Sequence, residues 1–221
     1  MLNSMASSSA YLDLKKHLDS KGVQLIAVSK TQPLSSIQAL YDLGQRAFGE
    51  NRVQELMEKQ AQMPEDIQWH IIGQLQRNKV KFLVPFVTMI QSVDSLRLAE
   101  TIDKEASKVG RRIDILLQVK IALEDAKTGW DIKALHEALP LLSKMDHVRI
   151  RGIMGMGTFT SDQEVTRQEF HDLRSHYNEI RSAHFATSDG FEILSMGMSG
   201  DYLLAIETGS TMVRIGSLLF M

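Results

Sequence analysis

The sequence predicts an α/β protein that folds as a single-domain (β/α)8 barrel with an extra N-terminal helix. Three observations support this fold. Apolar, strand-like runs alternate with helical stretches eight times, the 221 residues suit one such barrel, and no linker rich in Pro, Gly or Ser divides the chain. Alternating strands and helices imply parallel strands with right-handed crossovers. Eight units in this length favour a closed barrel over an open sheet.

The expected strands are short and mostly apolar. They lie at residues 25–30, 46–50, 67–73, 88–94, 113–119, 148–154, 191–196 and 212–220. A further helix is expected over residues 11–21, where Gly22 ends it. The Ser-rich residues 1–10 are expected to form a flexible tail, which leaves 11–221 as the barrel. Because no helix is expected after the last strand, we expect the N-terminal helix to cover the seam between the first and last strands.

Composition excludes several classes of function. The net charge of −2 gives no sign of a general nucleic-acid binder. The chain has no cysteine, which excludes disulfides, thiolate metal sites and a cysteine nucleophile. No apolar run approaches the roughly 20 residues of a membrane span, and the start lacks the pattern of a secretory signal. We therefore expect a cytoplasmic protein without membrane or nucleic-acid partners. The scattered histidines predict no metal site.

Lys30 is the first candidate for chemistry. It follows the apolar run Leu25–Ser29, and Pro33 then favours a turn and a new helix. Lysine is seldom buried, and strand C-termini carry the active sites of α/β barrels. A solvated lysine at a strand end is the alternative, and this stretch alone favours it. The remainder of the chain reverses that preference, so we expect an amine whose pKa is lowered by burial beside a cation.

The ends of the last two strands predict an anion-binding cradle. Ser199 and Gly200 precede a short helix near Asp201, and Gly216 and Ser217 close the last strand. Barrels often hold phosphate between these two loops, through backbone N–H groups and hydroxyls. Ordinary turn chemistry would explain the same residue types.

Arg214 lies in the otherwise apolar last strand. A charge in that position needs a ligand or a salt bridge, for which Glu50 and Asp94 are the alternative partners. An amine, a cradle and an inward arginine together suggest pyridoxal 5'-phosphate, which would form a Schiff base with Lys30. Arg214 could donate a hydrogen bond to its ring nitrogen. That nitrogen would then stay unprotonated, which makes the ring a weaker electron sink than an Asp partner would.

Five stretches then carry a family resemblance that spans nearly the whole chain. They are AVSKT at 27–31, FGEN at 48–51, WHIIGQLQRNK at 69–79, SMGMS at 195–199 and STMVRIG at 210–216. With them the sequence resembles the pyridoxal phosphate homeostasis proteins, the YggS/PROSC family, whose barrel is similar to the N-terminal domain of alanine racemase. The resemblance implies that the chain binds pyridoxal 5'-phosphate and buffers it or delivers it to apo-enzymes that depend on it.

The resemblance also implies roles for individual residues. Lys30 would carry the cofactor, Asn51 would lie near its ring and Arg214 would meet the pyridine nitrogen. The phosphate would contact Ser199, Gly216 and Ser217. The family is cytosolic and largely monomeric, with no established turnover. The chain departs from the family pattern at Arg52, Gln74 and Arg77, and in the glycine-rich run 155–157, which leaves the finer contacts of the rim open.

Two enzymatic alternatives remain open at this stage. An amino-acid racemase would need two opposed acid/base groups. Lys30 could be one, and of the tyrosines only Tyr202 is expected near the rim. A Schiff-base aldolase could use the same lysine and cradle without a cofactor, and it would be colourless as purified.

Overall fold

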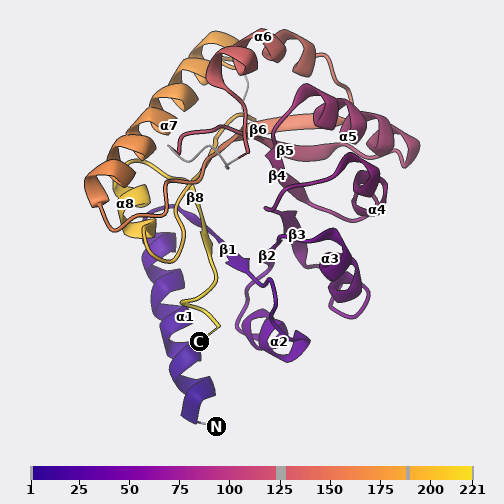
Figure 1. Cartoon of the computed structure of the whole chain (residues 1–221). Helices are drawn as coiled ribbons and strands as arrows, with labels where there is room; N and C mark the ends of the chain where they lie inside the picture. Colours follow the sequence, from indigo (N-terminus) through magenta and orange to yellow (C-terminus); the bar gives the residue numbers. More distant parts are fainter. Residues whose placement is uncertain (1, 123–127, 188–189, 221) are drawn as a thin grey trace.

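The strands form a closed parallel barrel in the computed structural model, which describes residues 2–122, 128–187 and 190–220. They follow one another around the barrel in chain order, and the first strand also pairs with the last. Figure 1 shows the helices arranged around them. This arrangement confirms the predicted (β/α)8 barrel. The strands are β1 (Gln24–Val28), β2 (Ala47–Glu50), β3 (Gln68–Ile71), β4 (Met89–Val93), β5 (Ile113–Gln118), β6 (Val148–Met154), β7 (Ile193–Ser195) and β8 (Met212–Ile215).

The longer helices bury an apolar side against the barrel. In α5, for example, Leu98, Ala99, Ile102 and Ala106 are buried at helical spacing. In the described part of the chain, no helix has the length and apolar character that a bilayer crossing requires. The helices are α1 (Leu2–Ser20), α2 (Leu34–Asp42), α3 (Val53–Gln60), the 3-10 turn η1 (Arg77–Lys79), α4 (Val80–Leu83), α5 (Leu96–Lys108), α6 (Ile132–Leu142), α7 (Gln163–His184) and α8 (Tyr202–Glu207).

The first helix is longer than the sequence suggested. It begins at Leu2, so the expected boundary at residue 11 differs from the structure. Serine is a modest helix former, but neither Gly nor Pro interrupts the chain before Gly22, so the helix can extend backwards. Tyr11 and Leu18 are buried. The helix packs against β1, which is one of the two strands at the seam it was expected to cover.

The barrel interior changes from apolar to polar along the strands. The apolar layer consists of Ile26, Ala47, Met89, Leu116, Met154, Ile193 and Met212. Two residues further along three of these strands, on the same face, stand polar side chains: Gln91, Ser195 and Arg214. The side chain of Gln91 on β4 reaches Met212 on β8, which lies on the opposite side of the barrel. The polar layer therefore fills the interior below the C-terminal ends of the strands.

Candidate functional site

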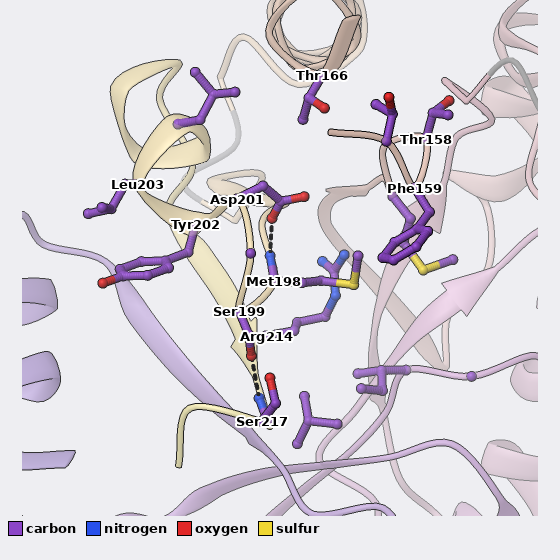
Figure 2. Close-up of a pocket in the computed structure, with 18 of the residues that line it drawn as sticks. Thr158, Phe159, Thr166, Met198, Ser199, Asp201, Tyr202, Leu203, Arg214 and Ser217 are labelled. Carbon is purple, nitrogen blue, oxygen red and sulfur yellow. Dashed lines mark hydrogen bonds between the residues drawn. The ribbon is translucent and has the colours of Figure 1, made fainter. Parts of the chain in front are cut away.

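A cavity of about 1170 Å³ lies at the C-terminal ends of the strands. All six residues predicted to bind the cofactor line it: Lys30, Asn51, Ser199, Arg214, Gly216 and Ser217. Figure 2 shows Arg214, Ser199 and Ser217 on neighbouring segments of its wall. The fold thus brings together residues from both ends of the chain, because β1 pairs with β8.

Lys30 lies in a turn just beyond the end of β1, and its side chain is exposed. This differs from the buried amine that the sequence suggested. The strand ends two residues earlier, and Thr31 adopts a left-handed conformation with φ of 62°. Non-glycine residues rarely adopt that conformation, so surrounding contacts must hold it. The backbone N–H of Thr31 donates to Oε1 of Glu55, at 2.5 Å.

A buried charge cluster supports this turn. The ammonium of Lys59 on α3 donates to Glu50 Oε1, to Glu55 Oε1 and to the carbonyl oxygen of Ser29, each at 2.7 Å. Ser29 Oγ donates to the same oxygen of Glu50, at 2.6 Å. Burial raises the pKa of the Glu50 carboxyl, and the hydrogen bonds from Lys59 and Ser29 oppose that effect. The cluster therefore fixes the backbone on both sides of Lys30.

This cluster differs from the sequence-based expectation, which paired no residue with Lys59. Glu55 and Lys59 are four residues apart on one helix, which is the spacing of an ion pair and could have signalled it. Glu50 had been considered as a partner for Arg214. The structure assigns it to Lys59 instead, since Glu50 ends β2, which does not pair with β8.

Arg214 is 4% exposed and is held by neutral acceptors. Its Nη1 donates to Ser195 Oγ at 2.6 Å, and its Nη2 donates to the carbonyl oxygen of Gly155 at 2.9 Å. Burial lowers the pKa of Arg214 to about 10, with an opposing effect from Asp201. The guanidinium is therefore still charged at neutral pH. Its contacts are not the salt bridges to Glu50 or Asp94 that were the alternative.

The cradle joins the loops after β7 and β8. The backbone N–H of Gly216 donates to Ser199 Oγ, at 3.3 Å. A Cβ at Gly216 would lie 3.1 Å from the carbonyl oxygen of Val28, so glycine allows β8 to approach β1 here. Ser217 is exposed beside it. The hydroxyls of Ser199 and Ser217 and the N–H of Gly216 thus lie at the wall of the cavity where the two loops meet.

Asn51 is positioned by a close backbone approach. A Cβ at Gly73 would lie 2.5 Å from the carbonyl oxygen of Asn51, so only glycine fits beside it. The end of β3 therefore fixes the residue that follows β2. This contact had no signal in the sequence beyond the glycine itself.

The residues that depart from the family pattern lie around the rim. Arg52 and Arg77 are exposed at the starts of α3 and η1, and Gln74 lines the cavity. The cavity also extends under the segment before α7. There Thr158 and Phe159 line it, together with Thr166 on α7 itself, and Phe159 is 97% exposed. None of these three residues was predicted, because nothing in the sequence of this segment shows that it folds back over the barrel.

His70 is a histidine of the barrel core. It is buried in the barrel, and its Nδ1 lies 3.0 Å from Nε2 of Gln91. Burial lowers the pKa of His70 to about 4, so the ring is neutral at physiological pH.

Comparisons with known proteins agree with this geometry. The model of the family "Alanine racemase, N-terminal domain" matches residues 3–221. A pyridoxal phosphate homeostasis protein from Synechocystis sp. is 37% identical over 221 residues, which cover 98% of each chain. One from Aquifex aeolicus is 37% identical over 198 residues, which cover 89% of this chain and 86% of that protein.

Solved structures give the same result. PipY from Synechococcus elongatus, with pyridoxal phosphate bound, has a TM-score of 0.89 and 39% identity, and the match covers 97% of this chain and all of that one. Alanine racemase from Clostridium difficile shares the fold, with a TM-score of 0.78, 16% identity and coverage of 95% of this chain and 55% of that one. The chain belongs to the pyridoxal phosphate homeostasis protein family, built on the alanine racemase N-terminal fold.

Proposed function

We propose that the protein binds pyridoxal 5'-phosphate, holds it covalently on Lys30 and buffers it or delivers it to apo-enzymes. The observation that carries the proposal is the single cavity in which an amine, a buried guanidinium and a serine–glycine cradle meet. When bound, the cofactor supplies an aldehyde that condenses reversibly with an amine.

The residues in the cavity fit that molecule. The primary amine of Lys30 matches the aldehyde, and the cradle of Ser199, Gly216 and Ser217 offers uncharged donors for a phosphate. Arg214 offers a charged N–H donor for the ring nitrogen. Because arginine keeps its proton, it would leave that nitrogen unprotonated and favour storage over carbanion chemistry.

A carrier role fits the geometry better than a racemase role. Racemisation requires acid/base groups on two opposite faces of the substrate. Tyr202 was the candidate for the second face, and it lines the cavity. Figure 2 shows its ring directed away from Arg214 and Ser199. We further propose that the protein is monomeric and acts in the cytoplasm.

The test is the absorbance spectrum of the purified protein, followed by borohydride reduction and peptide mass spectrometry. We expect a yellow protein and a reduced adduct on Lys30. Mixing the loaded protein with an apo-enzyme that depends on the cofactor should then restore that enzyme's activity. A chain that stays colourless when offered the cofactor would contradict the binding proposal. Rapid deuterium uptake at Cα of an amino acid would contradict the carrier role.

The cradle yields a separate prediction. Changing Ser199 and Ser217 together to Ala should weaken retention of the cofactor by roughly tenfold to a hundredfold, because a hydrogen bond to a charged group contributes about 1.5–3 kcal/mol. Equilibrium dialysis measures the change. The matched control is Ser107→Ala with Ser182→Ala, two exposed helical serines that bond only to their own helices. If both double variants retained the cofactor equally well, the proposal that Ser199 and Ser217 bind its phosphate would be wrong.

A further inference from the structure

A chain of hydrogen bonds runs through the barrel interior from Arg214 to His70. Arg214 on β8 donates to Ser195 on β7. Ser195 Oγ lies 2.7 Å from Oε1 of Gln91 on β4, and Nε2 of Gln91 lies 3.0 Å from Nδ1 of His70 on β3. All four residues are at most 4% exposed.

The direction of this chain follows from Arg214 and from the amide of Gln91. A guanidinium has only donors, so Ser195 Oγ must accept from it. The single hydroxyl proton of Ser195 is donated to Oε1 of Gln91, which leaves the NH2 group of that amide facing the histidine. Nδ1 of His70 must therefore accept, which places the ring proton on Nε2. The donors that face the ring therefore determine its tautomer.

We infer that Ser195, Gln91 and His70 are positioning residues, which hold Arg214 as a fixed donor aimed at the cofactor's ring nitrogen. The inference rests on the proposed function for its ligand. Ser195 accepts a hydrogen bond from Arg214, Gln91 accepts one from Ser195, and His70 accepts one from Gln91. The bond to Ser195 therefore holds the guanidinium of Arg214 in one orientation. The carbonyl oxygen of Gly155 fixes a second N–H direction of the guanidinium.

The hydrogen-bonded side chains are neutral, and this affects the charge that Arg214 presents to the cofactor. Ser195, Gln91 and the carbonyl of Gly155 carry no net charge, and the low pKa of His70 keeps that ring neutral as well. A carboxylate in place of any of them would pair with the guanidinium and reduce its field at the ring nitrogen. The chain therefore orients Arg214 without neutralising it, and the ring nitrogen stays unprotonated.

The first test needs no cofactor. In the ligand-free protein, ¹⁵N NMR of the His70 ring should show a neutral imidazole with the proton on Nε2. In the Gln91→Glu variant the introduced carboxylate cannot donate, so the His70 proton should move to Nδ1. A wild-type ring that already carries its proton on Nδ1 would overturn the chain's direction.

The second test uses the loaded protein. Ser195→Ala and Gln91→Met should each still form the reducible adduct on Lys30. Their visible absorbance band should shift, and release of the cofactor should speed up by about tenfold, the effect of one charged hydrogen bond. The matched control is Gln45→Met, since Gln45 is also a buried glutamine but lies before β2 and bonds to Tyr11 and to the carbonyl oxygens of Leu25 and Ala47.

The outcomes separate the two proposals. If Ser195→Ala matches the Gln45→Met control in band position and release rate, the positioning role is wrong while the binding function stands. If the wild-type protein forms no adduct, the proposed function is wrong. The proposed bond from Arg214 to a ring nitrogen is then wrong as well. A Ser195→Thr variant that restores the wild-type band supports the positioning role, because it returns only the hydroxyl.

Discussion

Replacing Lys59 with methionine is expected to lower the free energy of unfolding by about 3–5 kcal/mol, the cost of leaving a buried charge without its partner. The Lys59 ammonium is the cation that bonds to Glu50, which is 0% exposed. Methionine fills a similar volume but supplies no charge and no donor. A loss of this size is a large fraction of the stability of an ordinary domain, so urea denaturation should show it clearly.

Two further variants serve as controls for the Lys59→Met experiment. Lys108→Met removes an exposed partner of Glu105 and should change stability by at most about 1 kcal/mol. Lys59→Met combined with Glu50→Gln should recover part of the loss, because it removes the buried anion as well. If the Lys59 and Lys108 variants unfolded at the same urea concentration, the cluster would have no structural importance.

Changing Lys30 to alanine is expected to abolish the reducible adduct completely, because alanine has no amine to condense with an aldehyde. The cavity keeps Arg214 and the serine–glycine cradle, so the variant should still bind the cofactor without a covalent bond. Mass spectrometry after borohydride measures the first effect, and equilibrium dialysis measures the second.

Lys120 provides the control for this change. It lies two residues beyond β5, but it is absent from the residues that line the cavity in the described part of the chain. Lys120→Ala should keep the adduct at the wild-type level. An adduct that persists in Lys30→Ala and disappears in Lys120→Ala would move the covalent attachment to the other lysine.

The sequence by itself determined the barrel and the ring of residues around its mouth. Apolar runs predict the strands, helical spacing predicts the helices, and chain length predicts a single barrel. In such a barrel the C-terminal ends of all strands lie at one rim. Lys30, Arg214 and Ser199 could therefore be assigned to one site before any coordinates were known. Lys30 follows β1, Ser199 lies in the loop after β7 and Arg214 lies within β8, so their positions could be read from the order of the strands without tertiary contacts.

Only the tertiary structure decided what surrounds those residues. Lys59 comes from α3 and His70 from β3. The spacing of Glu55 and Lys59 signals their own ion pair, but nothing in the sequence shows that Lys59 meets Glu50 or that His70 meets Gln91. Which buried charge meets which partner depends on register and on the distance across the barrel. For this reason the exposure of Lys30, the pairing of Glu50 with Lys59 and the chain from Arg214 to His70 appeared only once the strands were closed into a ring.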